Sequence, residues 1–207
     1  METLVFILEI IGTIAFAASG AMVGINKKMD IFGVCILGLT VSIGGGVIRD
    51  LILGNTPPNT FKNPVYAVVA IVVSIIVFIP QVRSLLKRTQ KIYDMTMLIM
   101  DSVGLGVFTV VGVQVAYSVP YDTGYFLAIF VGVLTGVGGG ILRDLFADDV
   151  PYIFVKHIYA CASLAGAVLC ALLWNVIGQA AAMIVGSVTV MALRFLAAHF
   201  RWSLPKA

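Results

Sequence analysis

The sequence is poor in charged residues. Lysine, arginine, aspartate and glutamate make up only 11% of its 207 residues, whereas 60% are hydrophobic and the mean hydropathy is +1.07. Soluble domains carry about 25% charged residues, so this chain cannot cover its apolar surface as a soluble protein does. We therefore predict an all-α integral membrane protein, because apolar runs long enough for helical spans recur throughout. Residues 1–207 are expected to form a single membrane domain.

Residues that carry catalysis or bind metals are also scarce. Cysteine occurs three times and histidine twice, and their spacing resembles neither a metal site nor a disulfide framework. The glycine-rich stretches lack the lysine and Ser/Thr that follow the glycines of a nucleotide-binding loop. The sequence therefore predicts no enzyme activity, no resident metal and no cofactor. A net charge of +3 gives no indication of a nucleic-acid partner.

Seven apolar segments are long enough to cross a bilayer as helices. They cover residues 3–25, 31–53, 64–82, 94–117, 122–147, 152–175 and 177–197. With Arg49 and Arg143 left aside, only Lys62 lies on one side of the predicted membrane. The basic residues of the other side are Lys27, Lys28, Arg83, Lys87, Arg88, Lys91, Lys156, Arg194, Arg201 and Lys206. The positive-inside rule then predicts an N-terminus outside the cell and a C-terminus in the cytoplasm.

The sequence Gly-Gly-Gly-x-x-Arg-Asp occurs twice inside these apolar segments, at residues 44–50 and 138–144. The flanking residues are related as well, since Phe16 matches Phe108 when the chain is shifted by 92 residues. We therefore predict two repeats of three helices, followed by one more helix. The repeats cover 3–82 and 94–175, and the seventh helix covers 177–197. Because three crossings leave the chain on the opposite side, the second repeat is inverted relative to the first.

The glycine triplets are the predicted functional feature of the repeat. Consecutive glycines weaken a helix, and backbone groups freed within a bilayer must be buried in protein or face water. We therefore predict that the second and fifth helices kink or unwind at the triplets and border a permeation path near the midplane. The residues concerned are Gly44, Gly45, Gly46, Gly138, Gly139 and Gly140, with Ser42 and Thr135 as polar neighbours that could line the path. The alternative is packing, because small residues also let helices approach closely.

Charged residues accompany both triplets. The predicted buried charges are Glu9, Arg49, Asp50, Asp101, Arg143 and Asp144. Sequence neighbours on a helix point about 100° apart, so we expect Arg49 not to pair with Asp50. The repeat-related Glu9 and Asp101 are candidate partners for the arginines, as are contacts between the repeats. A buried arginine could shape a pore or only tie two helices together, and a third possibility places these charges near lipid headgroups.

Two copies of this motif, each with a proline seven residues after the Asp, resemble the TRIC family of trimeric intracellular cation channels. The proline positions are Pro57 and Pro151. The resemblance covers essentially the whole chain and is closer to the prokaryotic branch, also labelled a glycine-transporter domain. It implies a homotrimer in which each protomer conducts K⁺ and Na⁺ through its own pore between the second and fifth helices. Animal members carry a Lys-Glu-Val stretch, linked to inositol-lipid binding, where this chain has Arg-Asp. We therefore expect no regulation by inositol lipids, and we expect the protein to lie in a prokaryotic plasma membrane.

Three functions remain open from the sequence. The leading hypothesis is a passive channel for monovalent cations, with K⁺ or Na⁺ as permeant ions and membrane lipids as partners, including a possible bound lipid. The second is a secondary transporter for a small amino acid such as glycine, in which the inverted repeats rock around a central site. The third is a membrane scaffold that transports nothing.

Overall fold

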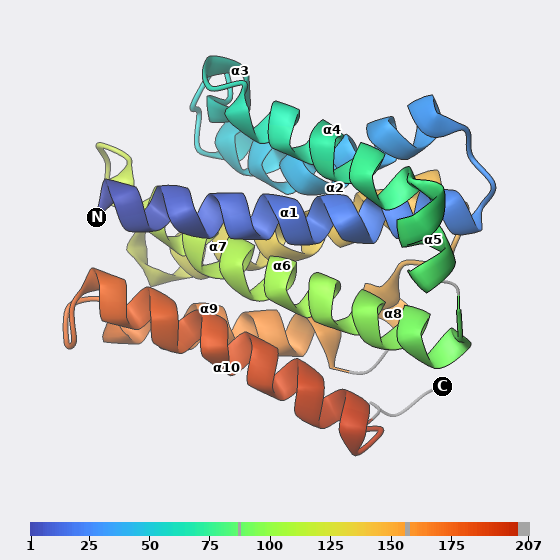
Figure 1. Cartoon of the computed structure of the whole chain (residues 1–207). Coiled ribbons are helices and arrows are strands. Elements are labelled where there is room, and N and C mark those ends of the chain that lie inside the picture. Colours follow the sequence, from blue (N-terminus) through green and yellow to red (C-terminus); the bar gives the residue numbers. More distant parts are fainter. Residues whose placement is uncertain (87, 156–157, 203–207) are drawn as a thin grey trace.

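The computed structural model describes residues 1–86, 88–155 and 158–202, which form ten helices and no strand. The helices are α1 (Glu2–Asn26), α2 (Ile31–Ile52), α3 (Asn59–Lys62), α4 (Val65–Phe78), α5 (Pro80–Leu86), α6 (Gln90–Ser118), α7 (Gly124–Phe146), α8 (Tyr152–Val155), α9 (Tyr159–Leu173) and α10 (Gln179–His199). Figure 1 shows the long helices running side by side, with the N-terminus at one end of the bundle.

Polar side chains fix where two of the long helices begin. Asp30 precedes α2 and accepts a hydrogen bond from the Gly33 amide at 2.7 Å. Thr89 precedes α6, and its hydroxyl accepts from the Ile92 amide at 3.2 Å. Such N-caps satisfy amides that have no partner within the helix, so the short polar breaks between apolar runs also position the helices.

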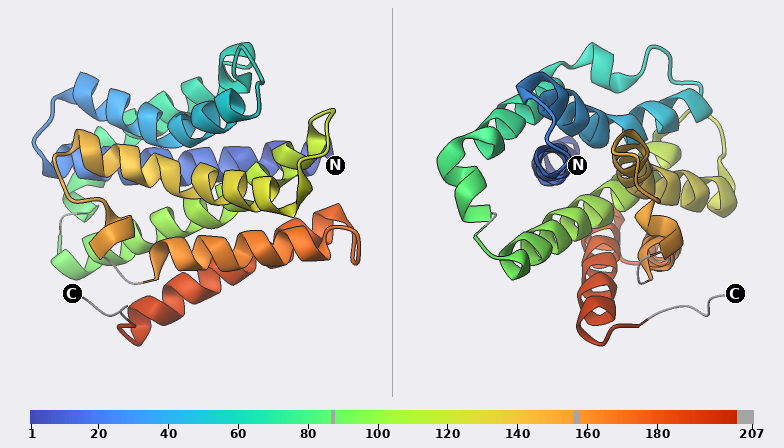
Figure 2. Two further views of the ribbon diagram at one scale, coloured as in Figure 1. Left: turned by 180° about the vertical axis from the view of Figure 1, so that it is seen from behind. Right: turned by 90° about the vertical axis from the view of Figure 1, so that its right-hand side faces the viewer.

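The two central helices are α1 and α6, which pack against each other. Helix α1 also contacts α2 and α4, while α6 contacts α7, α9 and α10. Helices α2 and α7 complete the bundle by packing on one another, as the two further views in Figure 2 show. The motif-bearing helices therefore lie against each other and beside the central pair.

The spans confirm a membrane-type helical protein, although the number of long spans differs from seven. Five helices, α1, α2, α6, α7 and α10, are long and apolar enough to cross a membrane, and α4 with α5 gives a sixth only if this bent pair is one span. The bend is 75° and falls at Pro80, which lacks an amide hydrogen and restricts the residue before it. The predicted span 152–175 corresponds to α8 and the shorter apolar α9, and residues 156–157 between them lie outside the described part.

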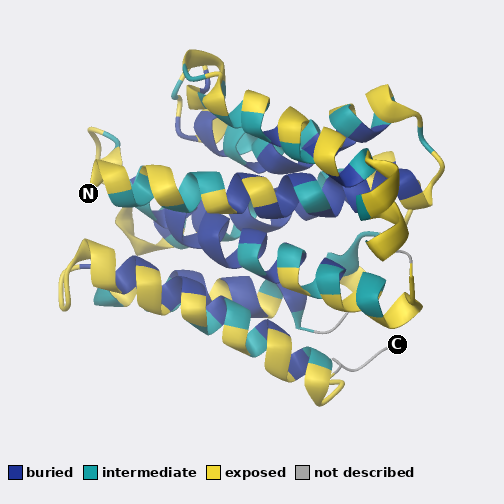
Figure 3. Cartoon of the chain, viewed as in Figure 1, coloured by how far each residue is buried: buried dark blue, intermediate teal, exposed yellow. Residues whose placement is uncertain are grey.

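Large apolar side chains cover the outside of the bundle. Phe126 is 83% exposed and Phe32 is 72% exposed, whereas Phe16 in the interior is 1% exposed. Figure 3 shows exposed residues along the outer faces of the helices and buried residues on the faces that meet. An apolar exterior of this extent fits lipid rather than water.

Most of the basic residues counted for topology gather at one end of the bundle. Those within the described residues are Lys27, Lys28, Arg83, Arg88, Lys91, Arg194 and Arg201, whereas Lys87, Lys156 and Lys206 lie outside them. The end of α1, the helix α5, the start of α6 and the end of α10 lie at this end (Figure 1). Lys62, in α3, lies at the other end.

Candidate functional site

The glycine triplets do not interrupt their helices. Helix α2 continues from Ile31 to Ile52 and α7 from Gly124 to Phe146, with every residue of both triplets in helical conformation. The predicted unwinding at the triplets is therefore wrong. The reason is packing, because the cost of glycine in a helix is only about 1 kcal/mol per residue and the closely packed partner helix holds each backbone in place.

The middle glycines are where α2 and α7 touch. A Cβ atom added to Gly45 would lie 2.4 Å from the Thr135 carbonyl oxygen, and one added to Gly139 would lie 2.2 Å from the Val41 carbonyl oxygen. Such distances are too short for any side chain, so only glycine allows this approach. The contact is reciprocal between the two helices, and this confirms the packing role that the sequence offered as the alternative.

The outer glycines of each triplet have different surroundings. A Cβ on Gly44 would meet the flexible Leu142 side chain at 2.3 Å, and one on Gly138 would lie 3.2 Å from the Gly45 Cα. Gly46 has open space, with the Arg49 guanidinium as its nearest neighbour at 3.7 Å. A Cβ on Gly140 would lie 2.8 Å from the Tyr159 hydroxyl. The last glycine of each triplet thus faces a charged or polar side chain.

The two polar neighbours of the triplets use their hydroxyls for backbone hydrogen bonds. Ser42 donates to the Gly38 carbonyl at 2.7 Å and lies 3.2 Å from the Thr13 carbonyl on α1. Thr135 donates to the Val131 carbonyl at 2.6 Å. Both residues are buried. Ser42 therefore links α2 to α1, whereas Thr135 bonds within α7.

Each arginine of the motif pairs with the aspartate that follows it. The Nε atoms of Arg49 and Arg143 lie 2.8 Å from the Oδ1 atoms of Asp50 and Asp144, respectively. The expectation that such neighbours would not pair is wrong. Although the two Cα–Cβ bonds diverge, the long arginine side chain reaches around the helix to the carboxylate, and burial favours this charge-assisted bond.

The second carboxylate oxygen of each aspartate holds the segment beyond the proline. Asp50 Oδ2 accepts from the Asn59 amide at 2.7 Å, and Asp144 Oδ2 accepts from the Tyr152 amide at 2.8 Å. These amides open the short helices α3 and α8, where no partner exists within the helix. In both repeats the aspartate of the Arg-Asp pair thus binds the segment that follows the proline and holds it against the end of α2 or α7.

The charge cluster around Arg143 is buried and joins four helices. Arg143 Nη1 donates to Asp101 Oδ1 on α6 at 2.6 Å and to the Ser19 hydroxyl on α1 at 2.7 Å. The Tyr159 hydroxyl of α9 also donates to Asp101 Oδ1, at 3.3 Å. Arg143 is 0% exposed and Asp101 is 1% exposed. The predicted partnership between Asp101 and an arginine of the motif is confirmed, and the pair lies inside the protein rather than at its surface.

Glu9 occupies the related place near Arg49 but has another partner. Its Oε2 accepts from the Tyr66 hydroxyl of α4 at 2.5 Å, and Glu9 itself is half-buried. Arg49 is buried and pairs with Asp50. Glu9 and Arg49 nevertheless line the same small hollow. The described residues therefore form two similar clusters, each with a carboxylate on a central helix, an Arg-Asp pair and a tyrosine.

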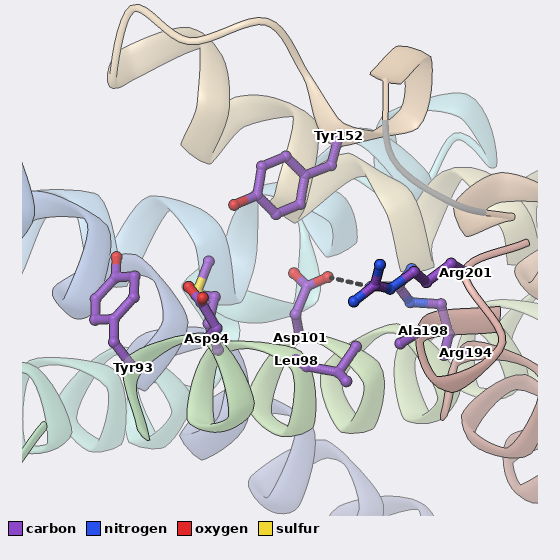
Figure 4. A pocket seen from close by; sticks show the side chains of 9 residues that line it. Tyr93, Asp94, Leu98, Asp101, Tyr152, Arg194, Ala198 and Arg201 are labelled. Carbon is purple, nitrogen blue, oxygen red and sulfur yellow. Dashed lines mark ion pairs between the residues drawn. The ribbon is translucent and has the colours of Figure 1, made fainter. Parts of the chain in front are cut away.

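A hollow adjoins each cluster. The larger, of about 430 Å³, is lined by side chains of α6, α8 and α10, including Asp94, Asp101 and Arg194 (Figure 4). The smaller, of about 30 Å³, is lined by residues of α1, α2, α3, α4 and α6, including Glu9 and Arg49. Between the clusters, the rings of Phe16 and Phe108 lie 5.3 Å apart, and Phe108 also borders the smaller hollow.

Sequence reasoning missed several of these contributors. Tyr66 gives no pattern that separates it from an ordinary interfacial aromatic, and the same holds for Tyr159 outside the motif. Arg194 was counted only as a topology signal, yet it is 5% exposed and its Nη2 lies 3.7 Å from Asp101 Oδ2. The match of Phe16 with Phe108 was visible as a repeat, but their contact was not.

Within the described residues, no three His, Cys, Asp or Glu side chains gather as a metal site requires.

Comparison with known sequences identifies relatives along nearly the whole chain. A family model described as "Glycine transporter" matches residues 6–81 and 98–175. The UPF0126 inner membrane protein YadS of Escherichia coli K12 is 35% identical over 204 residues, which cover 98% of this chain and 95% of that protein. The UPF0126 membrane protein YvgT of Bacillus subtilis is 34% identical over 200 residues, covering 96% of this chain and 94% of its own.

Solved structures of cation channels have the same fold. A prokaryotic TRIC channel crystallised in 0.5 M KCl superimposes with a TM-score of 0.88 at 31% identity, covering 99% of this chain and 100% of that one. The TRIC trimeric intracellular cation channel orthologue from Rhodobacter sphaeroides gives a TM-score of 0.86 at 33% identity, covering 97% and 100%. This likeness supports a cation channel. The chain therefore belongs to the TRIC family, in the prokaryotic branch that includes the UPF0126 membrane proteins and the glycine-transporter family model.

Proposed function

We propose that this protein is a monovalent-cation channel for K⁺ and Na⁺. One observation carries the proposal: two similar clusters, each with a carboxylate beside a hollow, lie on either side of a buried pair of phenylalanines. On α1, Glu9 precedes Phe16 by seven residues, and on α6, Asp101 precedes Phe108 by seven residues, about 10 Å of helix in each case. Because α1 and α6 run in opposite directions, the carboxylates fall toward opposite ends of the bundle (Figure 1).

The route inferred from this arrangement passes along the central helices rather than through breaks at the glycines. It leads from the small hollow at Glu9, past Phe16 and Phe108, to Asp101 and the large hollow. Carboxylates near both ends favour cations over anions, as they do in other cation pathways. The contact of Gly45 and Gly139 would then form one wall of the route, and Gly46 would border it.

The phenylalanine pair would close this route in the described conformation. Phe16 is 1% exposed and Phe108 is 9% exposed, and we place these two buried, contacting rings between the hollows on the proposed route. An apolar constriction stops ions because it excludes the water that must hydrate them. Conduction would therefore require the rings to separate or rotate, and the structure corresponds to a closed state under this proposal.

The proposed architecture is an inverted repeat of three and three helices followed by α10. It is supported by the family model, which matches residues 6–81 and 98–175, and by the related contacts around Arg49 and Arg143. We further propose that α9, with α8 before it, is a short span, which makes seven. The TRIC neighbour described as trimeric supports a homotrimer, and we propose one pore in each protomer. The plasma membrane, with the N-terminus outside, is proposed from the inner-membrane relative and the basic end of the bundle.

Recording from purified protein in planar bilayers tests the proposed function. Under a KCl gradient, unitary currents that reverse close to the K⁺ equilibrium potential are expected. The competing carrier, favoured by the description of the family model, predicts saturable glycine uptake into liposomes without unitary current. Glycine uptake in the absence of unitary current would contradict the channel proposal, and empty bilayers with purified detergent provide the control.

A further inference from the structure

Among the described residues, the charge cluster around Asp101 includes an arginine from the last helix, and the cluster around Glu9 does not. The cluster around Glu9 contains one arginine, Arg49, and two carboxylates, Glu9 and Asp50. The cluster around Asp101 has the same set, with Arg143 and Asp144, and adds Arg194 of α10. At full ionisation the first cluster has one more carboxylate than guanidinium, and the second is balanced.

Arg194 is held in a position that faces the larger hollow. Its guanidinium lies over the Tyr159 ring, 4.7 Å from the ring centre, and its residue is 5% exposed. Figure 4 shows Arg194 and Asp101 pointing toward each other at the wall of the hollow, with Arg201 nearby. The cation–π contact orients the guanidinium and so holds its charge in place beside Asp101.

The two oxygens of Asp101 have different surroundings. Oδ1 accepts hydrogen bonds from Arg143 and Tyr159, whereas Oδ2 has no hydrogen-bond partner among the described residues. Arg194 Nη2, at 3.7 Å, compensates the charge of Oδ2 but is too far away for a hydrogen bond. Oδ2 is thus a buried hydrogen-bond acceptor beside the hollow. The guanidinium of Arg194 compensates its negative charge but donates no hydrogen bond to it.

We propose that Arg194 limits cation conductance by occupying the place beside Asp101 that a permeating K⁺ would otherwise take. This inference rests on the proposed channel function and assigns a role in it to α10, the helix outside the repeats. The positive charge lowers the concentration of cations in the larger hollow. The smaller hollow is also lined by an arginine, Arg49, but that charge is matched by Asp50 at 2.8 Å, so the charge of Glu9 is not offset by a further arginine. The two ends of the route therefore attract cations unequally.

Charge removal at Arg194 gives the direct test. For a unit charge acting across roughly 10 Å of water, Coulomb's law predicts about a 2-fold change in local cation concentration. Arg194→Gln should therefore raise unitary K⁺ conductance about 2-fold at low salt and make the current–voltage relation asymmetric. The gain should diminish at 1 M KCl, where screening is effective within about 3 Å. Arg194→Lys, which retains the charge, should conduct like the wild type.

Arg201→Gln is the matched control, because Arg201 lines the same hollow but is exposed and lies beyond the end of α10. Solvent screens its charge, so the conductance should change less than in Arg194→Gln. The inference is overturned if wild-type channels conduct and Arg194→Gln gives the same unitary conductance as wild type or as Arg201→Gln. It is also overturned if Arg194→Lys changes conductance as much as Arg194→Gln, because the role of the side chain is then structural. Failure of the wild type to conduct would instead count against the proposed function.

Discussion

Replacing Gly139 by alanine tests the contact that joins α2 to α7. The added Cβ would lie 2.2 Å from the Val41 carbonyl oxygen and 3.0 Å from the Phe16 ring. Because the carbonyl belongs to helical backbone, it cannot rotate away, and α2 as a whole must move by about 1 Å to restore ordinary contact in a closely packed interior. Overpacking of this kind costs about 1–3 kcal/mol.

Gly46→Ala provides the matched control. Gly46 lies in the same triplet pattern on α2, but a Cβ there would be 3.7 Å from its nearest neighbour, the Arg49 guanidinium. Both substitutions gain the same helix propensity, about 1 kcal/mol, so this gain cancels when the two variants are compared. The difference in unfolding free energy between them is therefore the cost of overpacking alone, about 1–3 kcal/mol.

Thermal unfolding in detergent, followed by tryptophan fluorescence, measures this difference. For a chain of this length each kcal/mol shifts the midpoint by about 2–4 °C, so Gly139→Ala should unfold about 2–12 °C below Gly46→Ala. Gly45→Ala, whose Cβ would lie 2.4 Å from the Thr135 carbonyl oxygen, should behave like Gly139→Ala. Equal midpoints for Gly139→Ala and Gly46→Ala would refute the close contact and return the glycines to the role of a hinge.

Two further predictions concern the route and the charges beside it. Phe108→Ala should raise K⁺ flux into liposomes several-fold, because it removes half of the aromatic pair, whereas Phe126→Ala, at an 83% exposed position, should not; unchanged flux in folded Phe108→Ala would place the constriction elsewhere. Arg143→Gln leaves two buried carboxylates without their main cation and should cost about 3–5 kcal/mol, measured by thermal unfolding. Arg49→Gln, which removes the partner of one carboxylate in the cluster with the half-buried glutamate, should cost less, and a larger loss there would contradict this comparison of the clusters.

The boundaries of the helices show how far sequence patterns reach. The predicted spans 3–25 and 31–53 agree with α1 and α2 to within one residue at each end, because each combines a continuous apolar run with clear polar ends. The span 64–82 does not continue as one straight helix, since Pro80 bends it by 75°. That proline was visible in the sequence, and its effect on the preceding residue was the signal to use.

The charged residues show where sequence reasoning stops. The repeated motif located Arg143, and its relation to Asp101 was anticipated because both positions recur in the repeats. The pairing of Arg143 with Asp144 was not, because the rule for neighbouring positions considers Cβ directions and neglects the reach of a long side chain. The contact of Arg194 with Asp101 could not be predicted from the sequence. These two residues are 93 positions apart, on helices whose packing no local pattern specifies.

The sequence by itself determined that this protein is a helical membrane protein and that its motif is repeated. These properties follow from composition, periodicity and internal similarity, which are carried by the chain whatever its fold. Only the tertiary structure decided that the triplets pack instead of unwinding, and that Asp101 faces two arginines. The physical reason is that both outcomes depend on how closely helices approach, and this distance is set by the packing of the whole bundle.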